Sequence, residues 1–142
     1  MSSLNISELL NALDHEDHNN LIDTTFASIA KDKNDILQKL QFDNKTLKTM
    51  HSKLKDYRYI DELNDLKYGQ YVRWINIKDP DNLRVTNGGI FLDLKILDTG
   101  VHLLCKNRMN RMFQIKLDEC ILFQKLSNQE YIILQAMEYV NK

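Results

Sequence analysis

The first part of the chain carries apolar residues at steps of three and four, the spacing of a helix that buries one side along its length. From about residue 20 to residue 57 this stripe continues without a glycine or a proline. The apolar positions of the stripe are Ile22, Phe26, Ile29, Ile36, Leu40, Leu47, Met50 and Leu54. The pattern predicts one long helix over 20–57, long enough for a coiled coil, that packs on a partner helix or a second copy.

Two polar residues, Lys33 and Asp43, interrupt the stripe. In a coiled coil, polar residues at such positions fix register and partner number but lower stability. A second interpretation is a helical hairpin that turns at residues 43–44, with Asp43 as the N-cap of the second helix. Short helices or turns are expected on either side, over 7–13 and over 59–66.

From Gly69 onward the period of the pattern changes to two, as in strands. Five stretches rich in β-branched and aromatic residues are separated by turn residues. They span 70–78, 90–97, 101–106, 111–117 and 120–125. Five short antiparallel strands in so few residues are typical of a small β-barrel. A last helix is expected to begin at a capping box of Ser127 and Glu130 and to end near Val140.

All four glycines and the one proline lie between Gly69 and Gly100. These residue types ordinarily punctuate a chain, so their confinement marks the change from helix to strand. The sequence therefore predicts an α+β chain with a helical region over 1–66 and a small β-barrel with a C-terminal helix over 67–142. The boundary is placed near Lys67.

Charge is unevenly distributed, although the formal net charge is only −1. Residues 1–66 hold eight Lys and Arg against twelve Asp and Glu, whereas residues 67–142 hold eleven against eight. Within 67–117 the count is nine against four. Such an excess is either an ordinary solvated face or a surface for a polyanion or an acidic partner. No apolar run suits a membrane span and no secretory signal is visible, so we expect a soluble, intracellular protein without membrane insertion.

The residue types that perform catalysis are few and poorly placed for it. His102 and Cys105 are three residues apart on one expected strand, so their side chains point to opposite faces. Cys105 and Cys120 are expected to be buried free thiols. Two histidines in the acidic segment 14–18 could ligate a metal ion, but a solvated corner between helices is the favoured interpretation. We predict no enzyme activity, no cofactor, no metal site and no small-molecule substrate.

Three short stretches resemble a known group of proteins. They are LKYGQYVRWI at 66–75, the glycine pair and isoleucine at 88–90, and ILFQK at 121–125. Together they resemble small proteins of nucleocytoplasmic large DNA viruses, in which a Gly-x-Tyr-Val-Arg strand opens a small barrel of the Src-homology-3 or Tudor type. The resemblance implies a virion-associated or assembly-related protein, located in the virion or in the cytoplasm of the infected host cell, and brings no catalytic residues.

These patterns predict a non-enzymatic structural or assembly protein. The stripe over 20–57 would drive oligomerisation or docking onto a partner helix, and the barrel would contact other copies of the chain or other structural proteins. The alternative is a nucleic-acid-binding adaptor that uses the basic loop over 106–111. The binding residues expected in either case are Arg73, Lys106, Arg108 and Arg111.

Overall fold

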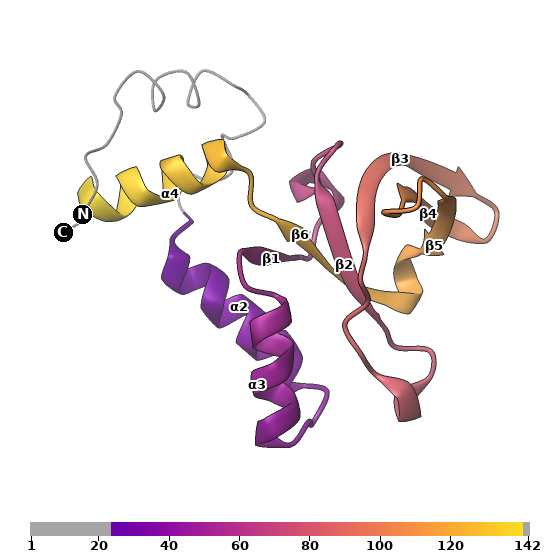
Figure 1. Ribbon diagram of the computed structural model, residues 1–142, viewed down its shortest axis with the longest axis horizontal. Helices are drawn as coiled ribbons and strands as arrows, with labels where there is room; N and C mark the ends of the chain where they lie inside the picture. The colour runs from indigo at the N-terminus through magenta and orange to yellow at the C-terminus, as the bar shows by residue number, and fades with distance from the viewer. Residues whose placement is uncertain (1–23, 141–142) are drawn as a thin grey trace.

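The computed structural model describes residues 24–140, which form a mixed α+β structure (Figure 1). Its helices are α2 (Phe26–Gln38), α3 (Asn44–Lys53) and α4 (Asn128–Val140). Its strands are β1 (Tyr57–Ile60), β2 (Tyr71–Asn76), β3 (Gly89–Leu97), β4 (Gly100–Lys106), β5 (Met112–Lys116) and β6 (Cys120–Lys125). Short 3-10 turns occur at Leu63–Asp65, Pro80–Asn82 and Leu117–Glu119.

The strands form one antiparallel sheet in the order β1-β6-β2-β3-β4-β5. The five predicted strands correspond to β2 through β6, and the tight connection between β3 and β4 is a hairpin as expected. The prediction of a five-stranded barrel is wrong in two respects, because the sheet has six strands and stays open, with β1 and β5 at its edges. The sixth strand, β1, was expected to be the end of a helix and the start of a turn.

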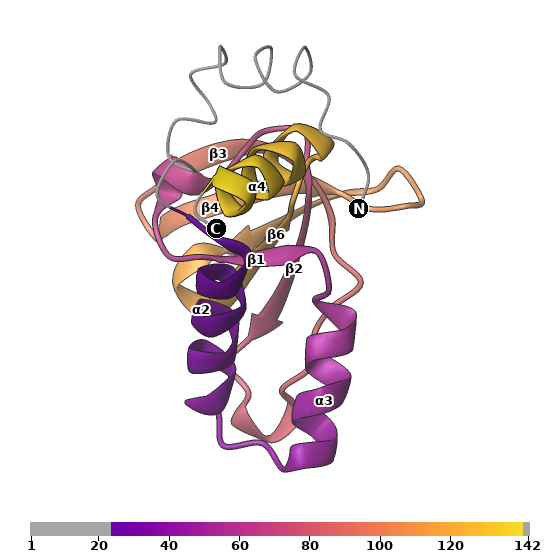
Figure 2. The same ribbon diagram turned by 90° about the vertical axis from the view of Figure 1, so that its left-hand side faces the viewer.

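The single long helix predicted over 20–57 is also wrong. The helix α2 ends at Gln38, and a turn containing Gln41 at a φ of 59° leads into α3. The Oδ1 atom of Asp43 accepts a hydrogen bond from Thr46 N at 2.7 Å, so Asp43 is the N-cap of α3, as the hairpin alternative predicted. Figure 2 shows α2 and α3 side by side and running in opposite directions.

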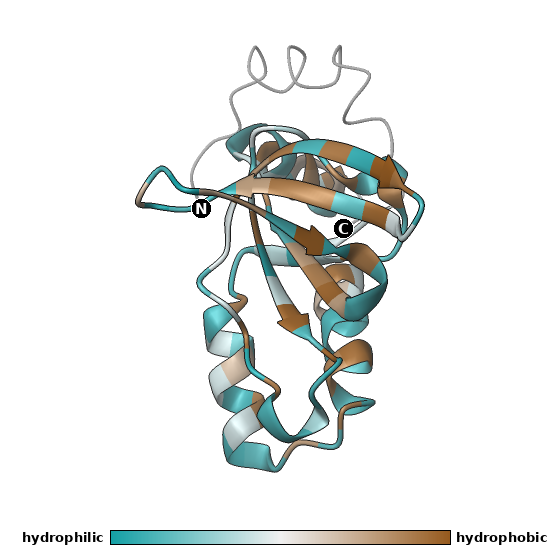
Figure 3. Ribbon diagram, turned by 90° about the vertical axis from the view of Figure 1, so that its right-hand side faces the viewer, coloured by the Kyte–Doolittle hydropathy of each residue, from teal (hydrophilic) through white to brown (hydrophobic). Residues whose placement is uncertain are grey.

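The two helices bury their apolar side chains against the sheet and only secondarily against each other. One core cluster joins them to the sheet and consists of Leu37, Met50, Leu54, Ile75, Val85, Ile121 and Phe123. A second cluster fills the opposite face of the sheet and consists of Ile60, Leu66, Val72, Trp74, Phe91, Leu103, Cys105 and Leu122. The sheet is therefore covered on both faces where β6 runs between β1 and β2, and the apolar strands are visible in Figure 3.

The two polar residues in the helical stripe serve the ends of α3. Asp43 satisfies a free N–H group at the start of α3, while Lys33 Nζ donates to the Leu54 carbonyl at 3.0 Å, just past its end. Free carbonyl groups at a helix C-terminus favour a nearby cation. Burial lowers the pKa of Lys33, against a smaller opposite effect of Asp56. Asp43 and Lys33 therefore stabilise the two ends of the short helix α3. In the heptad interpretation they would instead have fixed the register and number of partner helices.

The sheet extends across the predicted boundary at Lys67. Strand β1 lies on the N-terminal side of that position, yet its residues pair with β6, from Tyr57 opposite Lys125 to Ile60 opposite Leu122. Gln124, which is buried, also exchanges two hydrogen bonds of 2.7 Å with the backbone of Lys67. The change of sequence period near Lys67 therefore does not coincide with an edge of the sheet, which has strands from both sides of this position.

Replacing Gly88 with alanine is expected to lower the free energy of unfolding by about 2–4 kcal/mol. The alanine would be strained in a left-handed backbone conformation, and its Cβ would also clash with a neighbouring carbonyl group. Gly88 has a φ of 77°, and an added Cβ would lie 1.9 Å from the Val72 carbonyl oxygen. Gly69 is a matched control, since its φ is 81° but nothing lies within 4 Å of an added Cβ. Gly69→Ala should lose only about 1–2 kcal/mol. Urea unfolding measures both, and equal losses would contradict the close approach at Gly88.

Candidate functional site

The residues predicted for oligomerisation or helix packing are buried or half-buried wherever the structure describes them. Ile29, Met50 and Leu54 are buried. Half-buried members of the stripe pack around them, and these are Phe26, Ile36, Leu40 and Leu47. Ile22 lies outside the described residues. The helix packing that the stripe provides is therefore packing onto this chain's own sheet and onto α4, whereas a role in oligomerisation stays a prediction.

Arg73 is not part of the surface formed by the other predicted binding residues. Its Nη1 donates to the Lys53 carbonyl at 2.6 Å, and its Nε donates to the Thr86 carbonyl at 2.7 Å. The guanidinium also lies 6.0 Å from the ring centroid of Tyr57. These contacts tie the last residue of α3 to the β2–β3 loop, so Arg73 stabilises the fold, and a role in binding stays a prediction.

The basic loop between β4 and β5 forms where the sequence predicted it. The Asn107 side chain shapes the loop, because its Oδ1 accepts from Met109 N at 2.9 Å and from Arg111 N at 3.1 Å. Arg108 and Arg111 are exposed, and Lys106 is half-buried at the end of β4. The structure therefore brings three of the four predicted binding residues together at the end of β4 and in the loop that follows it.

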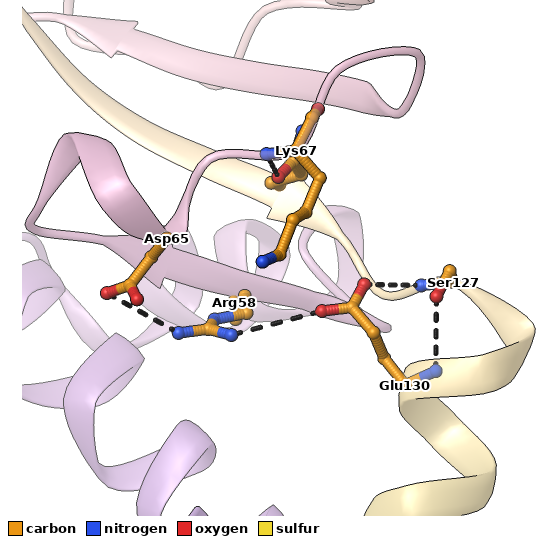
Figure 4. A network of polar contacts seen from close by, with 6 residues as sticks. Arg58, Asp65, Lys67, Ser127 and Glu130 are labelled. Carbon is orange, nitrogen blue, oxygen red and sulfur yellow. Dashed lines mark hydrogen bonds and ion pairs between the residues drawn. The ribbon is translucent and has the colours of Figure 1, made fainter. Parts of the chain in front are cut away.

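A buried polar network lies between β1, the turn Leu63–Asp65 and α4 (Figure 4). Glu130 accepts from Ser127 N at 2.9 Å and lies 4.0 Å from Arg58 Nη1, while Asp65 lies 3.7 Å from Arg58 Nη2. Ser127 Oγ accepts from Glu130 N at 3.1 Å, which completes the predicted capping box. Sequence analysis missed the role of Arg58, because nothing local indicates that it faces the start of α4.

The two thiols are unsuited to nucleophilic chemistry at neutral pH. Both cysteines are free, Cys105 in the core and Cys120 half-buried. Burial raises the pKa of each thiol to about 11, so both stay protonated and a thiolate, the reactive form, is scarce. His102, three residues before Cys105, has its Nε2 2.9 Å from Thr99 Oγ1. This geometry argues against a Cys–His pair on β4.

Among residues 24–140, no three His, Cys, Asp or Glu side chains are grouped so that they would hold a metal ion. The segment 14–18, with its two histidines, lies outside the described residues. In the same part of the chain, no helix combines the length and the apolar character needed to cross a membrane.

The hairpin of β3 and β4 presents the most exposed apolar side chain of the described residues. One face of this hairpin carries the pairs Leu94–Leu103 and Ile96–Val101. The row begins in the core, where Leu103 is buried, and ends at Ile96, which is 85% exposed. Leu97 beside it is 47% exposed. In Figure 1 this hairpin lies at the opposite end of the molecule from α4. The side chain of Leu97 points to the other face of the hairpin, so we call the row alone the hairpin surface.

The alternating sequence of β3 indicated one apolar face. It did not indicate that Ile96, at the end of this face, would be exposed to solvent.

The chain was also compared with known proteins. No family model matches it, and neither the curated proteins nor the solved structures contain a match.

Proposed function

We propose that this protein is a non-enzymatic structural or assembly protein, and that its hairpin surface binds the same surface of a second copy. The observation that carries the proposal is the 85% exposure of Ile96 at the end of an apolar row whose other members are buried or half-buried. Full burial of an isoleucine side chain is worth about 1.5–3 kcal/mol, so leaving it in water forgoes a large contribution. Exposed apolar surface that continues a core is typical of interaction sites.

The apolar composition of the row favours a second copy over an unrelated partner. The exposed side chains of Asp93 and Lys95 alternate with the row and point to the opposite face of the hairpin, so the row itself carries no charge. In a two-fold symmetric contact the same surface of each copy meets the other, so the apolar row of one copy can cover that of its partner. An uncharged apolar row is in this way complementary to itself.

The finer parts of the prediction belong to the same proposal. Strands β2 to β6 follow one another so that the last, β6, returns beside the first, β2. We propose that this strand order is an open variant of the Src-homology-3 type to which β1 is added at the edge beside β6. A viral origin, with a place in the virion or in the cytoplasm of an infected cell, rests on the sequence resemblance alone.

An Ile96→Asp substitution should abolish self-association, because a carboxylate on each copy would be buried at the centre of the contact. Light scattering over a range of concentrations measures the mass. We expect a dimer or larger species for the unaltered chain and a monomer for the variant. Since the side chain is almost fully exposed, the fold should be unaffected.

Ile77→Asp provides the matched control. Ile77 is also exposed, at 38%, but it lies after β2 and away from the hairpin. This variant should associate like the unaltered chain. An unaltered chain that stays monomeric at its highest soluble concentration would refute self-association, as would an Ile96→Asp variant that associates normally.

A further inference from the structure

The five arginines of the chain divide into two groups. The guanidinium groups of Arg58 and Arg73 are engaged with carboxylates or carbonyl groups of the fold. Those of Arg84, Arg108 and Arg111 are exposed, and within residues 24–140 no hydrogen bond or ion pair occupies them. Arg84 and Arg108 each line a hollow, and both hollows have Trp74 in their lining, while Arg111 belongs to the same loop as Arg108.

The first hollow has a volume of about 440 Å³ and combines aromatic and cationic groups. Its lining includes Tyr71, Trp74, Phe113, Met109 and Arg108. Trp74 and Phe113 pack on each other with ring centroids 5.5 Å apart. No carboxylate lines this hollow, so the charge of Arg108 is not compensated locally.

The second hollow, of about 390 Å³, lies along the β2–β3 loop and includes Arg84, Lys78 and Asp79 in its lining. Trp74 lines both hollows, and Thr86 of the second is followed in the chain by residues 87–88 of the first. The Asp79 carboxylate accepts from Asp81 N at 3.3 Å, and Lys78 lies 3.4 Å from Glu119. Arg84 is therefore the free cation here. The two hollows share the largely buried Trp74 in their linings, and we call them together the trough.

We propose that this trough binds single-stranded nucleic acid. A single strand offers phosphates at regular intervals, and guanidinium groups bind phosphate oxygens through paired N–H donors. It also offers unstacked bases, whose flat faces pack on aromatic side chains whatever their identity. Tyr71 and Phe113 offer such aromatic faces in the hollow that Arg108 lines, and Met109 adds an apolar contact.

The trough does not suit a double helix as well. The bases of a duplex are stacked and paired, so none can enter a hollow without being flipped out. An acidic peptide would satisfy the arginines but would leave the aromatic lining without planar groups to contact. The coexistence of aromatic lining and free guanidinium groups therefore favours the single strand.

The protein carries its own reporter for this test, because Trp74 is the only tryptophan of the chain and lines both hollows. We expect an oligothymidylate of about 12 nucleotides, within the usual range of site sizes, to change the tryptophan emission of the full-length protein. Binding through three phosphates should weaken about 10- to 20-fold between about 50 and about 200 mM salt. Anisotropy of a labelled oligothymidylate gives an independent measure of the same affinity.

The double variant Arg84→Glu with Arg108→Glu should lose binding by at least about tenfold at low salt. Lys45→Glu with Lys48→Glu makes the same change of charge on α3 and should bind nearly as well as the unaltered chain. Three outcomes would overturn the proposal: no binding at low salt, equal loss in both double variants, or tighter binding of polyglutamate than of the oligonucleotide. The last would assign the trough to an acidic protein segment. None of these outcomes bears on self-association through Ile96, which is measured without nucleic acid.

Discussion

Replacing Glu130 with alanine should lower the free energy of unfolding by about 3–5 kcal/mol, the usual loss when one partner of a buried ion pair is removed. The Glu130 residue is 2% exposed and its carboxylate lies 4.0 Å from Arg58 Nη1. That nitrogen is buried and has no hydrogen-bond partner, so the carboxylate is its main compensation. Urea unfolding followed by circular dichroism measures the change.

Two comparisons separate the ion pair from the helix cap. Ser127→Ala removes only the hydroxyl that accepts from Glu130 N, and should lose about 1 kcal/mol. Arg58→Met combined with Glu130→Leu should regain most of the loss, because neither charge of the Arg58–Glu130 pair is then left buried without the other. A loss for Glu130→Ala no larger than that for Ser127→Ala would show that the ion pair contributes nothing. A double variant as unstable as Glu130→Ala would contradict the same explanation.

Replacing Leu37 with alanine should lower the free energy of unfolding by about 3–5 kcal/mol, the loss typical of a fully buried leucine that leaves a cavity. Leu37 is 0% exposed and lies in the cluster with Met50, Leu54 and Phe123, where α2, α3 and the sheet meet. Its substitution tests whether the helices are part of the sheet's core. The loss should be independent of protein concentration, because the contacts are within one chain.

The neighbouring Ile36 distinguishes this packing from the coiled coil that the heptad spacing indicated. Ile36 belongs to the predicted stripe and Leu37 does not, yet Ile36 is only half-buried. Ile36→Ala should therefore lose only about 1 kcal/mol, in proportion to the smaller apolar area. A larger loss for Ile36→Ala than for Leu37→Ala, or a loss that grows as the protein is diluted, would favour the coiled coil.

Elements whose signals are local were predicted well. The strands β2 to β6 and the helix α4 occur where period, turn residues and the Ser127–Glu130 box placed them. The basic loop with Arg108 and Arg111 was also identified, because the clustering of charges in a turn is a local property. Arg84 was overlooked, since a single arginine in a loop gives no signal until its hollow exists.

The failures share a cause, which is that periodicity identifies a buried side but not what covers it. The spacing of three and four persisted through the turn before Asp43, so two short helices looked like one. Tyr57 and Ile60 fit the end of an apolar stripe as well as they fit a strand, and only pairing with β6 decides for the strand. Arg73 looked like a free cation until the carbonyl groups of Lys53 and Thr86 were placed around it.

The sequence by itself determined the class of the fold, the positions of most elements, the capping of α4 and which sides of the elements are apolar. All of these depend on residues within a few positions of one another. Only the tertiary structure decided which strands lie beside β6, which arginine side chains have no partner among the described residues, and that the apolar row becomes exposed to solvent at Ile96. Those features depend on contacts between residues far apart in the chain, and local preferences leave them open because they carry no information about distant partners.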